Sequence, residues 1–171
     1  DSHDVAEIEE AAALIESIRP NIAQFHSSQY INALANGDIC LAVGWSGDVL
    51  QARDRAAEAG NDVRVEYAIP KEGAIMWFDQ MAIPSDAPNP DNAHTFINYI
   101  QNPKVIAKAS NYVYYANGNE TSQQYLVDDV INDPAIYPPE EAVENLYVTT
   151  PYPPRVQRVV TRLWTRIKTG S

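Results

Sequence analysis

Three short segments of the sequence combine aromatic rings with side chains that accept hydrogen bonds. The first is Trp45-Ser46-Gly47-Asp48, the second is Trp77-Phe78-Asp79, and the third is the tyrosine-rich run 112–115. A carboxylate accepts hydrogen bonds from an ammonium group, and a flat aromatic face attracts cations and packs against methylene chains. Tryptophan and aspartate, presented twice, therefore predict a site for an organic cation.

The same residues also have structural interpretations. Tryptophan is usually packed in or near a core, and an aspartate directly after a strand is often the N-cap of the next helix. Asp48, which precedes Val49, fits such a cap. Asp79 is harder to explain in this way, because a carboxylate inside an apolar strand needs a partner or a cleft to face. Both interpretations stay open for both aspartates.

Other kinds of site are not indicated by the spacing of the residues that could form them. His3, His26 and His94 are dispersed and lack partners at the spacing of zinc ligands, so we expect no metal site. Ser46 lacks the Gly-x-Ser-x-Gly spacing of a nucleophile elbow, and no glycine-rich phosphate loop can be written. We therefore expect no cofactor.

The charge of the chain bears on its partners. Twelve Lys and Arg against 23 Asp and Glu give 171 residues a formal net charge of −11. Such a surface repels phosphate backbones, so we expect no nucleic-acid partner, and it favours a cationic one. Acidic surfaces also promote solubility. Net charge alone does not choose between a cationic ligand and solubility.

Helical periodicity, capping residues and prolines predict most of the regular structure. An amphipathic helix is predicted from Val5 to Ile18, and a second helix, with a serine from Ser27-Ser28 as its N-cap, runs through Ala35 to Gly37. Further helices are predicted over residues 49–59, 91–101, 104–111, 122–132, 139–146 and 154–168.

Three segments have the length and pattern of strands. Ile39 to Trp45 is a continuous apolar run, typical of a strand buried on both faces, and Cys40 within it is expected to be a small buried hydrophobe. Residues 63–69 alternate with period two, and residues 75–83 form a further predicted strand. Alternating strands and helices predict an α/β fold. The strands are few for so many helices, which suggests that part of each sheet lies outside this sequence.

Longer blocks resemble the periplasmic putrescine- and spermidine-binding proteins of polyamine ABC transporters, most of all their putrescine-binding branch. The blocks are Arg19–Ile22, Phe25–Asn32, Leu34–Cys40, Gly44–Val49, Ile69–Ala74, Ile136–Pro139 and Arg162–Thr165. The resemblance extends over nearly the whole chain. It implies an α/β fold of the type II solute-binding kind, in which two lobes close on the ligand like a Venus flytrap. It also implies that this chain is the C-terminal half of such a protein.

The resemblance assigns roles to five residues. Trp45 and Trp77 would be aromatic walls, Asp48 a carboxylate for one amine, Asp79 the key carboxylate for an ammonium group, and Tyr115 a further aromatic contact. It implies that the protein binds putrescine, or a related polyamine such as spermidine, in the periplasm. It also implies delivery of the ligand to the membrane permease of an ABC transporter, without catalysis.

The resemblance also implies a division of the chain between lobes. Residues 1–63 would belong to the second lobe, residues 64–112 to the first, and residues 113–171 to the second again. The N-terminal half of the same protein would supply the other side of the site and a disulfide partner for Cys40. Because such a chain would expose apolar faces, we expect it to fold poorly by itself.

Two other functions remain open on these residues. The same fold could bind or sense another cationic amine. More distantly, Asp48 and Asp79 could be the paired carboxylates of a hydrolase such as a glycosidase, whose mechanism their separation would set. A purely structural α/β interaction module would leave Asp79 unexplained.

Overall fold

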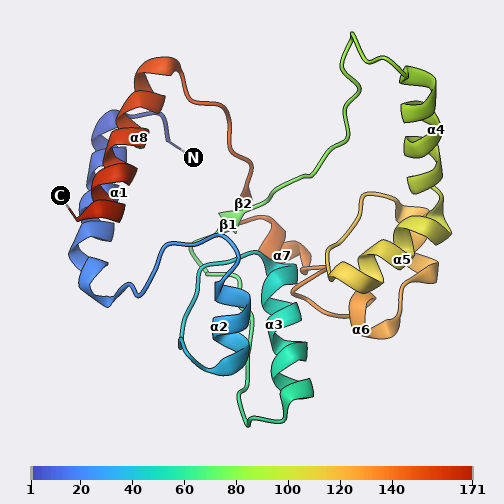
Figure 1. The fold of residues 1–171 in the computed structure, drawn as a ribbon, viewed down its shortest axis with the longest axis horizontal. Helices are drawn as coiled ribbons and strands as arrows, with labels where there is room; N and C mark the ends of the chain where they lie inside the picture. Colours follow the sequence, from blue (N-terminus) through green and yellow to red (C-terminus); the bar gives the residue numbers. More distant parts are fainter. Residues whose placement is uncertain (1, 171) are drawn as a thin grey trace. The chain divides into compact units, whose positions relative to one another are not determined.

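The computed structural model describes residues 2–170, which form two compact units (Figure 1). One unit consists of the described parts of residues 1–27 and 147–171, and the other spans residues 28–146. Within residues 2–170, no helix has both the length and the apolar character needed to cross a membrane.

The first unit is built on two packed helices. Its helices are α1 (Val5–Ile18), the short 3-10 helix η1 (Arg19–Asn21) and α8 (Pro154–Thr169). Ala12 of α1 packs against Leu163 and Ile167 of α8, and this contact forms the core of the unit. Asp4 caps α1 by accepting a hydrogen bond from the Ala6 amide at 2.7 Å. The predicted helices over residues 5–18 and 154–168 are thus confirmed.

The second unit contains the remaining elements. They are α2 (Tyr30–Asn36), α3 (Ser46–Ala59), β1 (Ala74–Ile75), α4 (Pro90–Ile100), α5 (Pro103–Val113), the 3-10 helix η2 (Glu120–Tyr125), α6 (Asp128–Ile131), α7 (Glu140–Val143) and, at its boundary, β2 (Leu146–Tyr147). The strands β1 and β2 pair with each other, and theirs is the one sheet found in the described part of the chain.

Helices α2 and α3 lie side by side and provide the main core of this unit (Figure 1). Tyr30 and Leu34 of α2 are buried with Val49 and Ala52 of α3. Helix α2 ends at Gly37, whose left-handed φ of 78° suits a residue without a side chain. The predicted serine N-cap is wrong, because the cap position is Gln29, which makes no side-chain capping hydrogen bond.

The predicted strand over residues 39–45 is not formed. The segment has no helical or strand hydrogen-bond pattern, and Leu41 and Val43 are 87% and 101% exposed. Ile39 and Ala42 pack against the α2–α3 core, so only part of the apolar run is covered. A strand needs a neighbour for its backbone N–H and C=O groups, and no described segment pairs with this one. Cys40, predicted to be buried, is exposed.

Residues 63–69 keep the predicted alternation without a paired ladder. Val63, Val65 and Tyr67 pack against the α2–α3 core, whereas Arg64 and Glu66 between them form an exposed ion pair at 2.8 Å. The period of two therefore describes which side chains face the core. It does not supply a partner strand, and no strand is formed over these residues.

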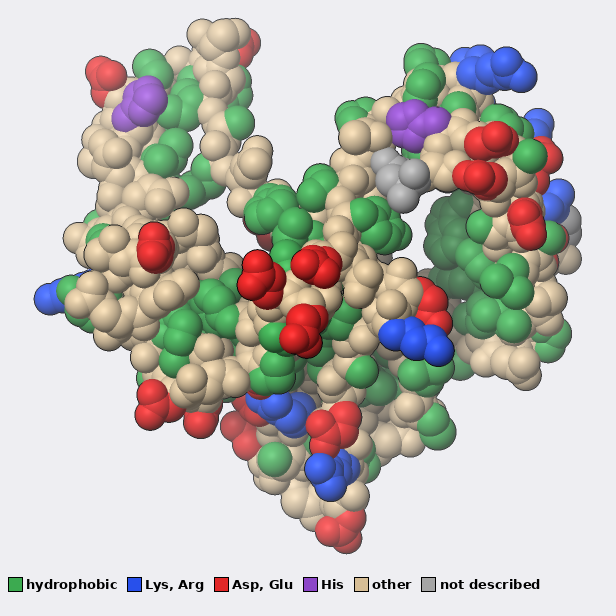
Figure 2. All heavy atoms as spheres, turned by 180° about the vertical axis from the view of Figure 1, so that it is seen from behind, with side chains coloured by type: hydrophobic (Ala, Val, Ile, Leu, Met, Phe, Trp, Pro, Cys, Tyr) green, Lys and Arg blue, Asp and Glu red, His purple; other side chains and the backbone are tan. Residues whose placement is uncertain are grey.

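The predicted strand over residues 75–83 is reduced to its first residue, Ile75 of β1. Beyond it Trp77, Phe78 and Met81 are 60%, 58% and 49% exposed. Figure 2 shows hydrophobic side chains uncovered on one face of the molecule, among several groups of acidic side chains. Exposed apolar patches of this kind are typical of interaction surfaces and ligand-binding grooves.

The remaining helices are confirmed in part. Helices α4 and α5 match the predictions over residues 91–101 and 104–111. The predicted helix over residues 122–132 is instead η2 followed by α6, because the Asn111 side chain donates to the Tyr125 carbonyl at 3.3 Å and accepts from the Val127 amide at 3.1 Å. These bonds take the place of helical ones. Helix α7 is shorter than the predicted 139–146, since Leu146 pairs in β2.

Candidate functional site

Asp48 lies in the first turn of α3. The helix begins at Ser46 rather than at Val49, and its N-cap is Trp45, so the interpretation of Asp48 as an N-cap is wrong. A carboxylate in the first turn interacts favourably with the positive end of the helix dipole. Within residues 2–170 Asp48 forms no ion pair. Asp48 is therefore a negative charge without a protein counterion in the described residues.

Two phenol groups hold the Asp48 carboxylate. Tyr30, the first residue of α2, donates to Oδ2 at 2.6 Å, and Tyr115, which follows α5, donates to Oδ1 at 3.2 Å. Burial, and then the hydrogen bond to Asp48, raises the pKa of Tyr30 from 10.0 to about 12. Burial and the nearby Asp48 charge also raise the pKa of Tyr115. Both phenols are therefore protonated at neutral pH and act as donors.

Two glycines make room for these tyrosine rings. A Cβ atom on Gly44 would lie 2.4 Å from the ring of Tyr30, and one on Gly47 would lie 2.3 Å from the ring of Tyr115. Real Cβ atoms essentially never approach another heavy atom so closely. The Gly44-Trp45-Ser46-Gly47 segment thus has a glycine at each contact with a tyrosine that reaches Asp48.

A left-handed residue directs Tyr115 toward α3. Tyr114 ends α5 with a φ of 59°, a conformation that non-glycine residues rarely adopt. The Asp54 carboxylate raises the pKa of the Tyr114 phenol, which places this phenol near Asp54, whereas the next side chain, Tyr115, reaches Asp48. Consecutive tyrosines therefore contact carboxylates at two places along one helix.

Trp45, three residues before Asp48 in the chain, forms an aromatic pair with Trp77. Their ring centroids lie 6.4 Å apart with planes inclined at 56°. The two residues are 48% and 60% exposed, so both are accessible to solvent. The structure therefore brings together Trp45 with Trp77, and Asp48 with Tyr115, within one unit.

Asp79 lies apart from these contacts. It is exposed, two residues beyond Trp77 in a segment without regular structure, and it has no hydrogen-bond or ion-pair partner among residues 2–170. The expectation that it sits within an apolar strand is wrong, because that strand is not formed. Its carboxylate is free in the described residues.

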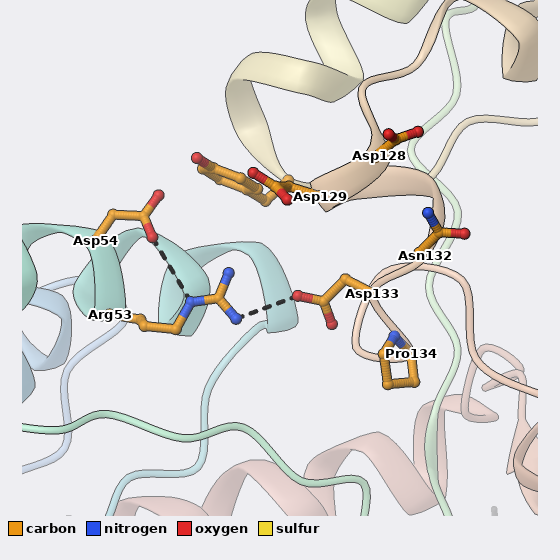
Figure 3. Close-up of a pocket in the computed structure, with 8 residues that line it drawn as sticks. Arg53, Asp54, Asp128, Asp129, Asn132, Asp133 and Pro134 are labelled. Carbon is orange, nitrogen blue, oxygen red and sulfur yellow. Dashed lines mark hydrogen bonds and ion pairs between the residues drawn. The ribbon is translucent and has the colours of Figure 1, made fainter.

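A second group of carboxylates surrounds a hollow of about 660 Å³ (Figure 3). Its lining residues are Arg53, Asp54, Tyr114, Asp128, Asp129, Asn132, Asp133 and Pro134. Arg53 of α3 pairs with Asp133 at 3.1 Å and with Asp54 at 3.6 Å, and Figure 3 shows its guanidinium between them. The charge of this hollow is partly compensated by the protein itself.

Metal binding is not indicated at either place. In the described part of the chain, no three His, Cys, Asp or Glu side chains are grouped so that they could hold a metal ion. Of the three histidines, His3 contacts Thr150 and Tyr152 within the first unit.

Tyr30, Gly44 and Gly47 belong to the site but were not predicted from the sequence. A tyrosine at the start of a core helix needs a hydrogen-bond partner for its hydroxyl, which is the signal that could have identified Tyr30. Two glycines around a tryptophan indicate close approaches, which is the signal for Gly44 and Gly47.

Comparison with known proteins identifies relatives over this whole region. Residues 1–138 match the family described as bacterial extracellular solute-binding protein. The putrescine-binding periplasmic protein PotF of Escherichia coli (strain K12) is 49% identical over 94% of this chain and 44% of its own length. The putrescine-binding periplasmic protein SpuD of Pseudomonas aeruginosa (strain UCBPP-PA14) is 45% identical over 100% of this chain and 47% of its own length.

A solved structure shares the fold. The spermidine/putrescine ABC transporter substrate-binding protein PotD of Streptococcus pneumoniae is similar with a TM-score of 0.75 and 25% identity, over 98% of this chain and 50% of that one. The predicted solute-binding protein fold is confirmed by this similarity. The chain spans about half the length of the relatives that it matches. It belongs to the bacterial extracellular solute-binding protein family.

Proposed function

We propose that this chain forms one side of a site for putrescine or a related polyamine such as spermidine. Five residues contribute to it, namely Trp45, Asp48, Trp77, Asp79 and Tyr115. In this proposal the chain is the C-terminal half of a two-lobed periplasmic protein, and the N-terminal half supplies the other side of the site. The loaded protein delivers its ligand to the permease of an ABC transporter.

In this proposal the chain is divided between two lobes, in the way that the resemblance implies. Residues 1–63 and 113–171 belong to one lobe, and residues 64–112 belong to the other. The uncovered side chains of Leu41 and Val43, and the absence of a partner strand for their segment within the described residues, support completion by further chain.

The observation that carries the proposal is the environment of Asp48. Its carboxylate is oriented by two phenol donors and has no protein counterion among residues 2–170. An ammonium group supplies the missing positive charge and up to three donors. The exposed side chains of Trp45 and Trp77 then suit the cation and the methylene chain that follows it. A flexible diamine combines these features in one ligand.

Putrescine is supported as the ligand by the relatives. PotF and SpuD, at 49% and 45% identity, are both described as putrescine-binding. This chain itself matches a family of extracellular solute-binding proteins. We therefore assign reversible binding without catalysis. Because both oxygens of Asp48 already accept phenol hydrogen bonds, a charge-neutralising role suits it better than that of a nucleophile.

Titration calorimetry tests this function on the two-lobed protein that contains this chain. Putrescine and spermidine are expected to give saturable heat and to raise the melting temperature. Asp79→Asn is expected to weaken binding by about 3 kcal/mol, as for a lost buried charge pair. If no polyamine gives heat or a thermal shift, polyamine binding is wrong. Heat with another cationic amine alone would retain the fold and change the ligand.

A further inference from the structure

The hydroxyl of Tyr30 connects two parts of the proposed site. It donates to Oδ2 of Asp48 at 2.6 Å and accepts from the backbone N–H of Trp45 at 3.1 Å. A phenol has one proton and an amide N–H only donates, so the direction of both bonds is fixed. One hydroxyl therefore sets the position of the carboxylate relative to the backbone that carries the aromatic wall.

The ring behind this hydroxyl is firmly held. Tyr30 is only 6% exposed and packs with Leu34 and Val49 in the α2–α3 core. Gly44 faces the ring so closely that a Cβ atom there would lie 2.4 Å from it. A phenol on a fixed ring provides a hydrogen bond of defined direction, which a flexible side chain does not.

The two tyrosines bond to different oxygens of the Asp48 carboxylate. Tyr30 bonds one oxygen of Asp48 and Tyr115 bonds the other. An ionised carboxylate offers about four acceptor positions on its two oxygens. The two phenols occupy about half of these, and the others remain available to an ammonium group. Rotation of the carboxylate would break both phenol bonds at once.

We infer that Tyr30 is a positioning residue of the polyamine site, which fixes Asp48 and Trp45 in the arrangement that receives the ammonium group. This inference rests on the proposed function. It predicts that the hydroxyl of Tyr30 contributes to affinity without touching the ligand, and that its contribution passes through Asp48.

A double-mutant cycle on the two-lobed protein tests this coupling. Tyr30→Phe keeps the ring and removes the hydroxyl, and it is expected to weaken putrescine binding about tenfold, because a hydrogen bond to a charged group is lost. In the Asp48→Asn background the same change is expected to alter the dissociation constant by about twofold or less. If Tyr30→Phe weakens putrescine binding by the same factor with and without Asp48→Asn, the two residues act independently and the inference is wrong.

Tyr67→Phe is the matched control. Tyr67 is half-buried against the same α2–α3 core, and no contact between its hydroxyl and Asp48 is recorded. Its removal is expected to leave putrescine affinity within about twofold of the wild type, since only hydroxyls bonded to Asp48 orient the carboxylate. Equal losses for Tyr67→Phe and Tyr30→Phe would mean that Tyr30 has only a structural role.

A ligand-free titration separates this inference from the proposed function. The ionisation of each tyrosine is followed by NMR with ring-labelled tyrosine, in the wild type and in Asp48→Asn. The pKa of Tyr30, raised to about 12 by burial and by Asp48, is expected to fall in Asp48→Asn, whereas that of Tyr67 is expected to stay unchanged. An unchanged Tyr30 titration overturns the positioning role, whatever the binding data show. Absence of polyamine binding by the wild type overturns the proposed function instead.

Discussion

Helix α3 carries carboxylates in two different environments. At its first turn, Asp48 is bonded by two neutral phenols and forms no ion pair within the described residues. Further along the same helix, Asp54 lies 3.6 Å from Arg53, which also pairs with Asp133 at 3.1 Å. The second environment contains its own cation, and the first does not.

Under the proposed function, this difference favours the region around Asp48, rather than that around Arg53, as the one that receives a cationic ligand. An arginine beside carboxylates competes with any incoming ammonium group for the same oxygens. Phenols orient a carboxylate without cancelling its charge. The comparison also shows that an acidic hollow is not sufficient, because the hollow of about 660 Å³ around Arg53 has several aspartates and no aromatic pair. The predictions below test this contrast in the two-lobed protein.

Along helix α3, the largest effect is expected from removal of the uncompensated charge of Asp48. Asp48→Asn should weaken putrescine binding about 100-fold, because an ammonium group would lose its charged partner in a partly desolvated site. Asp54→Asn, on the same helix, is the control and should change the dissociation constant by about twofold or less. Calorimetry measures both. Equal losses in the two variants would remove the distinction between the two environments.

Substitution of Gly47, the glycine that makes room for the Tyr115 ring, should have an effect almost as large. Gly47→Ala places a methyl group 2.3 Å from the Tyr115 ring, so we expect a loss of about 1–3 kcal/mol in the free energy of unfolding, as for overpacking elsewhere, together with weaker putrescine binding. Urea denaturation measures the stability.

Gly118→Ala is the control for this crowding. A Cβ atom at Gly118 meets nothing within 4 Å, and its φ lies outside the left-handed region. This variant should keep the stability of the wild type to within about 0.5 kcal/mol. If Gly47→Ala is as stable as Gly118→Ala, the close packing of Tyr115 against α3 is wrong.

The buried phenol of Tyr30 predicts that the folded protein loses stability at alkaline pH. The pKa of Tyr30 is raised from 10.0 to about 12 on folding, so the neutral phenol is favoured in the folded state. The resulting stabilisation is complete below pH 10 and is lost as the pH rises through about 12. Urea denaturation from pH 8 to about 12 should therefore show a steeper decline for the wild type than for Tyr30→Phe. If the stability of the wild type and that of Tyr30→Phe decline equally with pH, the raised pKa of Tyr30 is contradicted.

The sequence predicted elements that depend on local features, and it failed for elements that depend on distant partners. Helices α1, α4 and α8 were predicted to within a residue or two, because their caps, prolines and apolar faces are local features. The segment 39–45 was not, because a strand depends on a partner that local pattern does not reveal. Leu41 and Val43 are apolar yet exposed for the same reason.

The sequence selected residue types for a candidate site, but it did not predict the contacts between them. Trp45, Asp48 and Trp77 were selected by the chemistry that tryptophan and aspartate offer, and the structure places the two indole rings 6.4 Å apart. Tyr30 was missed because its contact with Asp48 joins residues from different helices, 18 positions apart. The roles of all five residues in ligand binding, those of Trp45, Asp48, Trp77, Asp79 and Tyr115, stay predictions.

The smallest effect is expected at the compensated region. Arg53→Met removes the cation between Asp54 and Asp133, both partly exposed to water. We expect at most about 1 kcal/mol of lost stability, because solvent screens such pairs, and an unchanged affinity for putrescine. Thermal unfolding and calorimetry measure the two quantities. A large loss of affinity would show that the Arg53 region takes part in binding.

Putrescine binding at Asp48 is tested most directly by a crystal structure of the two-lobed protein with putrescine bound. We predict an ammonium nitrogen within hydrogen-bond distance of the Asp48 carboxylate, with Tyr30 and Tyr115 still bonded to its two oxygens and the methylene chain against Trp45 or Trp77. Putrescine bound elsewhere, with Asp48 out of contact with either ammonium group, would contradict the proposed site.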